Sequence, residues 1–180
     1  MATRLLVLGL LDMQPMSGYD IQQMLKMTDA ERWSGVQVGS IYHALKKMEG
    51  EGLVEVTSIE QTGHRQKAVY RITEQGTEQL LGLTREALQA SSVTYPSPLY
   101  AGLSFVHKLP KEEALAALDI QARSLELEYQ SLEAGLEAKN GAMNGTVPPL
   151  TALTFDNMFD IVRQQQQFVS QAIQLLQSGG

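Results

Sequence analysis

The side chains best suited to chemistry lie on a predicted helix over residues 38–51. Four apolar residues recur there at the spacing of one helix face: Val38, Ile41, Leu45 and Met48. Four small, polar or basic residues share the opposite face: Ser40, His43, Ala44 and Lys47. Hydroxyl and imidazole groups bond base edges or phosphates, an alanine methyl contacts a thymine methyl, and Lys47 with the adjacent Lys46 binds phosphate. The face therefore fits a DNA groove, or it is an ordinary solvated helix surface.

A predicted β-hairpin with a basic tip follows this helix. Residues 53–60 and 68–72 are rich in β-branched side chains that roughly alternate with polar ones, and the polar residues 61–66 form the turn. Three basic residues fall in and after this turn with no acidic residue among them: Arg65, Lys67 and Arg71. Such a tip reaches the phosphate backbone or an adjacent minor groove, or it is a solvated hairpin whose charges prevent edge pairing. Because a basic helix face precedes it, the pattern favours nucleic acid.

The elements that must position these residues follow a recognisable order. A first helix is predicted over residues 2–13, and a second one begins after Ser17, with Asp20 at the third helical position as in a capping box. Residues 33–35 are predicted to form a loop before the third helix, and Thr73 to cap a fourth helix after the hairpin. Three helices followed by a two-stranded hairpin make a winged helix-turn-helix, whose third helix enters a major groove.

The chain divides in two at a Ser/Pro-rich stretch, residues 91–98, which is typical of a linker. We expect a mainly α fold with a small β-hairpin: a winged-helix DNA-binding domain at residues 1–92 and an α-helical dimerisation and effector domain at residues 93–180. Residues 1–85 carry 9 Lys and Arg against 10 Asp and Glu, and residues 86–180 carry 5 against 10. The net charge of −6 therefore lies mostly in the helical part, and it does not exclude a DNA-binding surface on the nearly neutral first part.

The helical part contains a heptad pattern that predicts a dimer. A short helix is expected near residues 99–108, a long one after Pro110, a loop over residues 140–149, and a last helix capped by Thr154. The long helix carries a seam at alternating spacings of three and four: Leu115, Leu118, Ala122, Leu125, Tyr129, Leu132 and Leu136. We expect this seam to pack partly on the last helix of its own chain and its remaining apolar face to form the dimer. The dimerisation residues are then Leu118, Leu125, Tyr129, Leu132 and Leu136.

Composition excludes several other classes of function. The absence of cysteine excludes disulfides, Cys-ligated zinc and thiol catalysis, and the three histidines have no metal-ligand spacing. No Gly-rich phosphate loop or nucleophile–base set is visible, so neither an enzyme nor a cofactor is expected. The apolar run at residues 5–11 is too short to cross a bilayer, which predicts a cytoplasmic protein that does not enter the membrane.

Three stretches of the first part resemble the DNA-binding domain of the PadR family of transcriptional regulators. They are Leu8–Leu11 through Ser17-Gly18-Tyr19-Asp20-Ile21, then residues 39–49 with Gly52-Leu53-Val54, and Tyr70-Arg71-Ile72-Thr73-Glu74-Gln75-Gly76. The resemblance covers roughly residues 4–80 and the combination is specific. The second part is similar only in architecture to the helical domain of the longer, AphA-like branch.

The resemblance implies a homodimeric regulator, a repressor, that binds double-stranded DNA at a pseudo-palindromic operator. By motif position it places Ser40, Tyr42, Lys46 and Lys47 at the DNA surface. Tyr19 would brace the helix-turn-helix or reach a phosphate, and His64, Arg65 and Lys67 would form the wing contact. His43 departs from the Pro that many relatives have there, and it either regularises the helix, alters the operator sequence or adds pH sensitivity.

Two further possibilities stay open at the level of sequence. Some relatives sense aromatic acids or hydrophobic drugs, and an effector pocket would here use Trp33 with Tyr95, Tyr100 and Phe105, near His107; each of these is otherwise a packing residue. The acidic total also fits a winged-helix protein-interaction module that binds no DNA, and the steep salt dependence of DNA binding distinguishes the two.

Overall fold

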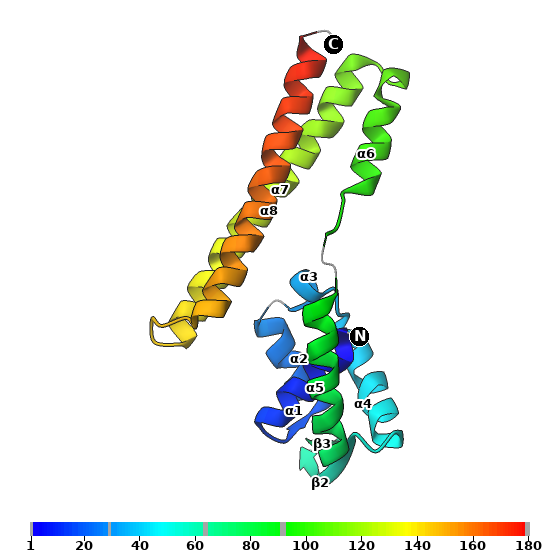
Figure 1. The fold of residues 1–180 in the computed structure, drawn as a ribbon, viewed down its shortest axis with the longest axis vertical. Helices are drawn as coiled ribbons and strands as arrows, with labels where there is room; N and C mark the ends of the chain where they lie inside the picture. Colours follow the sequence, from blue (N-terminus) through cyan, green and yellow to red (C-terminus); the bar gives the residue numbers. More distant parts are fainter. Residues whose placement is uncertain (1, 29, 63–64, 91–92, 179–180) are drawn as a thin grey trace. The chain divides into compact units, whose positions relative to one another are not determined.

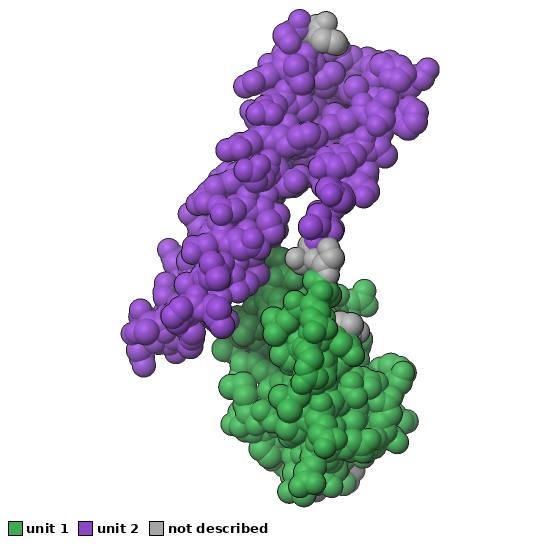
Figure 2. Space-filling model, viewed as in Figure 1, with its two compact units in different colours: residues 1–92 green, residues 93–180 purple. Residues whose placement is uncertain are grey.

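The computed structural model describes residues 2–28, 30–62, 65–90 and 93–178. It divides into two compact units, Met1–Ser92 and Val93–Gly180, coloured green and purple in Figure 2. The first unit contains helices around a small sheet, and the second contains helices and their connections over its described residues. This is the fold class expected from the sequence, and Figure 1 shows the order of the elements.

Five helical segments precede the hairpin of the first unit. They are α1 (Ala2–Met13), α2 (Gly18–Met27), α3 (Ala30–Ser34), the 3-10 turn η1 (Val38–Ser40) and α4 (Ile41–Gly50). The predicted helix over residues 38–51 is thus a 3-10 turn followed by an α-helix. The loop predicted at residues 33–35 is wrong for two of its residues, because Trp33 and Ser34 belong to α3 and Gly35 follows with φ of 67°. A five-residue helix is too short to show apolar periodicity, so the sequence gives no signal for it.

The sheet has three antiparallel strands in the order β1-β3-β2. They are β1 (Met16–Ser17), β2 (Val54–Thr62) and β3 (Arg65–Ile72). The hairpin is longer than predicted, because polar residues assigned to the turn continue the ladder as far as the pair Thr62–Arg65. Backbone pairing does not depend on side-chain polarity, so polar residues can continue a ladder. β1 was not predicted, since two residues are too few to show alternation, and it pairs Ser17 with Val69.

The core of the first unit gathers apolar faces from α1, α2 and α4. The side chains of Val7, Leu8, Ile21 and Ile41 are fully buried, and Leu45 and Met48 are nearly so. Ile41, Leu45 and Met48 are three of the four residues predicted for the inner face of the third helix; the fourth, Val38, lies in η1. Burial of this face fixes the rotation of α4 about its axis and leaves the opposite face toward solvent.

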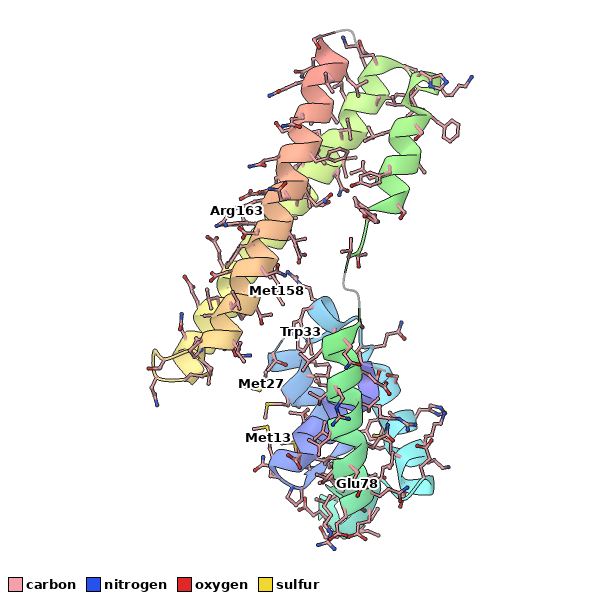
Figure 3. All side chains as sticks on the ribbon, in the orientation of Figure 1. Met13, Met27, Trp33, Glu78, Met158 and Arg163 are labelled. Atoms are coloured by element: carbon pink, nitrogen blue, oxygen red, sulfur yellow. The ribbon has the colours of Figure 1, made fainter. Side chains whose placement is uncertain are left out.

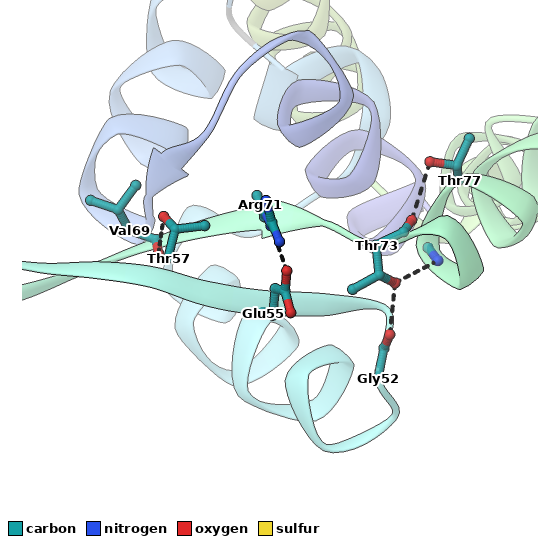
Figure 4. A network of polar contacts seen from close by, with 8 residues as sticks. Gly52, Glu55, Thr57, Val69, Arg71, Thr73 and Thr77 are labelled. Atoms are coloured by element: carbon teal, nitrogen blue, oxygen red, sulfur yellow. Dashed lines mark hydrogen bonds and ion pairs between the residues drawn. The ribbon is translucent and has the colours of Figure 1, made fainter.

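A tight joint holds the start of α5 (Glu74–Gln89) against the end of α4 (Figure 4). Thr73 caps α5 as predicted, because its hydroxyl accepts from the Gly76 amide at 3.0 Å. The same hydroxyl donates to the Gly52 carbonyl at 2.7 Å, and the Thr73 amide donates to the Leu53 carbonyl at 3.1 Å. A Cβ at Gly76 would overlap the Leu53 carbonyl oxygen, so this close approach requires glycine.

The second unit consists of α6 (Ser97–Ser104), the 3-10 turn η2 (Val106–Lys108), α7 (Lys111–Ala142) and α8 (Pro149–Gln177). The two long helices lie side by side in Figure 1, with Leu132, Phe159 and Val162 buried between them. Two predicted boundaries are wrong: α7 continues through the Asn-Gly at 140–141, and α8 begins at Pro149. The Thr154 hydroxyl donates to the Leu150 carbonyl inside α8, and Pro149 occupies a position where a helix needs no amide donor. No described helix is both long enough and apolar enough to cross a membrane.

Gly76→Ala should destabilise the first unit by more than about 2 kcal/mol, because the new methyl group meets the backbone and the Thr73 joint must open. Urea unfolding followed by circular dichroism measures this. Gly82→Ala, in the same helix, is the control: its Cβ would have no neighbour within 4 Å, so it should be neutral or stabilise by up to about 1 kcal/mol. Equal free energies of unfolding for the two variants would contradict the close packing of Gly76 on the Leu53 carbonyl.

Candidate nucleic-acid interface

The exposed face of α4 carries four of the residues predicted to contact DNA. Tyr42 is 55% exposed, and the side chains of His43, Lys46 and Lys47 also face solvent. Ala44 is half-buried and packs on the core, and the Ser40 hydroxyl donates to the Gln37 carbonyl at 2.7 Å. The predicted i, i+3, i+4, i+7 face is therefore rotated, because Ala44 lies next to the buried Ile41 and Leu45 on the helix wheel.

Tyr42 lies against the first residue of α2. A Cβ built on Gly18 would be 2.6 Å from Cε1 of Tyr42, so the ring occupies the space that any other residue would fill. Gly18 itself is buried. The Ser-Gly-Tyr-Asp stretch of the sequence therefore has a packing role, because its glycine lets an aromatic side chain of α4 contact the start of α2.

A reciprocal capping box begins α2, as the sequence predicted. The Asp20 amide donates to the Ser17 hydroxyl oxygen at 3.2 Å, and the Ser17 amide donates to Oδ2 of Asp20 at 3.2 Å. The Ser17 hydroxyl also donates to Oδ2 at 2.7 Å. Ser17 is 1% exposed, so these bonds satisfy a buried polar group and hold the Asp20 carboxylate in one orientation.

Lys67 of β3 binds this same carboxylate. Its ammonium nitrogen lies 2.9 Å from both Oδ1 and Oδ2 of Asp20, and 5.9 Å from the centre of the Tyr19 ring. Partial burial opposes ionisation of Asp20, but the hydrogen bonds from Lys67 and Ser17 outweigh it and lower the pKa of the carboxyl below its ordinary value. The hydrogen bond to Asp20 raises the pKa of Lys67. Tyr19 remains 54% exposed beside this pair.

The other basic residues of the hairpin differ in their surroundings. Arg71 forms an ion pair with Glu55, its partner in the β2–β3 register. Arg65 begins β3 and pairs with Thr62, and His64 lies outside the described residues. The sequence shows no acidic residue among Arg65, Lys67 and Arg71, but the fold supplies two, Glu55 from the neighbouring strand and Asp20 from α2. The sequence predicts Asp20 only as a helix cap, because its contact with the wing arises from the fold.

The residues predicted for an effector pocket are divided between the two units, with Trp33 in the first and Tyr95, Tyr100 and Phe105 in the second. Trp33 is 49% exposed, donates its indole N–H to the Thr28 carbonyl at 3.0 Å, and lies on an exposed surface with Met13 and Met27 (Figure 3). In the second unit, Tyr100 contacts Tyr95 and Phe168 ring to ring, whereas Phe105 is 65% exposed.

A hollow of about 260 Å³ lies between α6, η2 and α7 of the second unit. Its walls include Leu99, Leu103, Val106 and Leu118, and Gln121 supplies a polar group. Among the described residues, no group of three or more His, Asp or Glu side chains gathers that could hold a metal ion.

The residues predicted for the dimer seam pack on α8 of the same chain. Leu132 is buried against Phe159 and Val162, with Tyr129 and Leu136 beside them. The Tyr129 hydroxyl, which needed a partner, accepts a hydrogen bond from Arg163 of α8 at 2.9 Å. Of the residues predicted for dimerisation, Tyr129, Leu132 and Leu136 thus contact α8 of the same chain, and Leu118 is buried beside the α6 hollow. The role of Leu118, Leu125, Tyr129, Leu132 and Leu136 in a dimer stays a prediction.

Asp20→Asn should lower stability near neutral pH and have less effect in acid. Because the folded-state pKa of Asp20 is depressed, its ionic stabilisation is fully present above the unfolded value of about 3.9 and is lost as the pH falls through the folded-state pKa. Urea midpoints of wild type and variant, measured at about pH 7 and about pH 3, should therefore converge at the lower pH. A difference in urea midpoint between wild type and variant that stays constant or grows at the lower pH would contradict the Asp20–Lys67 ion pair.

The first unit matches a known protein family, and the whole chain has the fold of solved structures. Residues 7–81 match the model of the family described as the transcriptional regulator PadR-like family. The fold is similar to Bacillus subtilis PadR in complex with operator DNA, with 21% identity, 96% of each chain covered and a TM-score of 0.75. It is also similar to the Vibrio cholerae virulence activator AphA, with 18% identity, 100% of both chains covered and a TM-score of 0.71.

A further solved structure, Bacillus subtilis PadR in complex with p-coumaric acid, has 20% identity to this chain and a TM-score of 0.73 over 98% of it and 99% of that chain. No curated protein matches the chain. At these identities the solved structures show a shared fold, whereas the family model matches most of the first unit. The first unit therefore carries, in residues 7–81, a domain of the PadR-like family of transcriptional regulators.

Proposed function

We propose that the chain is a cytoplasmic, sequence-specific DNA-binding repressor that acts as a homodimer on a pseudo-palindromic operator. The observation that carries the proposal is the exposed face of α4, where Tyr42, His43, Lys46 and Lys47 project from a helix whose other face is buried. The N-terminal part of such a helix reads base edges in a major groove, and lysines at its far end contact phosphates.

Charge placement supports this orientation. Lys46 and Lys47 follow Tyr42 and His43 by one turn, so aromatic and imidazole groups precede the ammonium groups along α4. The solved fold neighbour from Bacillus subtilis is bound to operator DNA, and the proposal gives this chain the same class of partner. A half-site spacing of about one helical turn would follow from two winged helices in one dimer.

Lys46→Ala with Lys47→Ala should weaken binding to duplexes selected from a random pool by the wild-type protein. Each lysine that contacts a phosphate contributes roughly 0.9 to the slope of log affinity against log salt, and the double variant should lose that share. Fluorescence anisotropy at several salt concentrations measures the slope.

Lys26→Ala with Lys108→Ala is the control, because it removes two exposed positive charges away from α4. An equal loss in this control would mean that bulk charge, not the α4 face, binds the DNA. Failure of the wild type to enrich any duplex would favour the interaction module that binds no DNA.

The dimer surface that we propose is the outer side of the α7–α8 pair. Four residues of α8 are 56% to 78% exposed and fall within about 80° of one another on the helix wheel: Leu150, Leu153, Ile161 and Leu175. Ile120 and Leu127, both 66% exposed, lie two turns apart on the side of α7 that faces away from Leu118 and Leu132. Water-exposed apolar rows of this kind are stabilised when a second copy covers them.

Leu153→Glu with Ile161→Glu should dissociate the dimer and leave helical content unchanged, because both side chains lie outside the α7–α8 seam. Leu125→Glu with Leu132→Glu should instead disrupt the helical pair itself, with loss of circular dichroism signal. Sedimentation velocity gives the mass in each case, and Ser170→Glu, an exposed position away from the apolar row, is the control. A monomeric wild type, or an unchanged mass in the first variant, would refute this surface.

A small hydrophobic or aromatic effector completes the proposal. The hollow between α6 and α7 offers apolar walls and the Gln121 amide, a combination that fits such ligands. The solved p-coumaric acid complex belongs to the Bacillus subtilis neighbour, and here it supports only the class of ligand.

A further inference from the structure

The basic side chain at the centre of the wing is tied to the helix-turn-helix. Lys67 contacts both carboxylate oxygens of Asp20 at 2.9 Å, and its side chain is only 28% exposed. The Tyr19 ring lies on another side of the ammonium group, 5.9 Å away. A phosphate would have to displace a carboxylate that is already bound, so this lysine does not have the geometry of an open phosphate ligand.

The other end of this contact is fixed by the fold. Asp20 is held by the amide and hydroxyl of Ser17, and Ser17 is buried and pairs with Val69 in the β1–β3 ladder. Lys67 is two residues from Val69 on β3. A closed ring of contacts therefore runs from Ser17 to Asp20, to Lys67, and along β3 back to Ser17. Such a ring restrains the angle at which the hairpin leaves the body of the unit.

We infer that the Asp20–Lys67 pair positions the wing relative to α2 and α4, and that Lys67 is a positioning residue rather than a phosphate ligand. Tyr42 of α4 packs on Gly18, two residues before Asp20. Residues 18–20 therefore contact both α4 and the wing, and they position both. The inference rests on the proposed function for its effect on DNA, but the restraint on the hairpin exists in the free protein.

Opposite signs of effect distinguish the two roles. If Lys67 were a phosphate ligand, Asp20→Asn would remove a competing anion and strengthen DNA binding, and Lys67→Met would reduce the salt slope by roughly 0.9. If the pair positions the wing, Asp20→Asn and Lys67→Met should each weaken binding by roughly three- to tenfold with the salt slope unchanged. The double variant should bind no more weakly than either single one, because both remove the same contact.

The experiment measures affinity at several salt concentrations, on duplexes selected by the wild-type protein, for wild type, both single variants and the double variant. Lys26→Met is the control for loss of one positive charge in the same unit and should change neither affinity nor slope appreciably. Stronger binding by Asp20→Asn, or a reduced slope in Lys67→Met, would overturn the inference.

Amide hydrogen exchange without DNA supplies the second readout. Exchange at Val69 and Tyr70, which pair with β1, should quicken in both single variants, while exchange in the core of α1 stays slow and shows that the unit is folded. Unchanged exchange at these strand residues would overturn the inference. Absence of duplex binding by the wild type would instead refute the proposed function, and the exchange result would still decide whether the pair restrains the wing.

Discussion

The buried hydroxyl of Ser17 is the contact on which the candidate interface depends. Ser17 is the last residue of β1, and its hydroxyl caps α2 and donates a hydrogen bond to the Asp20 carboxylate. One side chain therefore connects a strand, a helix and the carboxylate that binds Lys67. The next residue, Gly18, provides the space for Tyr42 of α4. A winged helix must hold its recognition helix and its wing at fixed separation to meet two parts of one duplex. Here four consecutive residues, 17–20, contact both elements.

Electrostatics in this unit depends on tertiary pairing more than on charge count. The first 85 residues are nearly neutral, and the basic residues of α4 and of the hairpin differ in their surroundings. Lys67 and Arg71 form ion pairs with Asp20 and Glu55, whereas Lys46 and Lys47 lie on an exposed helix face. Paired charges contribute little long-range attraction to a polyanion, so under the proposed function the attraction for DNA would be centred on α4. The sequence around Lys67 and Arg71 does not show that these residues are paired, because their acidic partners lie 47 and 16 residues away.

Local signals predicted the parts of the fold that local interactions determine. The caps at Ser17 and Thr73, the first helix and the inner face of α4 were predicted correctly, since each depends on residues within a few positions. The two-residue strand β1 and the five-residue helix α3 were missed, because elements of that length show no periodicity and form through contacts with the rest of the unit. The candidate site divides in the same way: the exposed lysines of α4 follow from helix spacing, but the Asp20–Lys67 pair follows from the strand register.

The helical unit shows why a heptad seam alone does not identify a dimer interface. Alternating spacings of three and four require a partner helix, but they do not specify which chain supplies it. In this protein α8 satisfies the requirement: it buries Leu132 and provides Arg163 for the Tyr129 hydroxyl. α8 also has a second row of apolar side chains, which is exposed and lies on a different side of the helix from the buried Phe159 and Val162. This row consists of Leu150, Leu153, Ile161 and Leu175. A helix with two apolar sides needs two partners, and one of them is already present in the chain. The second row of α8, more than the heptads of α7, is therefore the observation behind the proposed dimer.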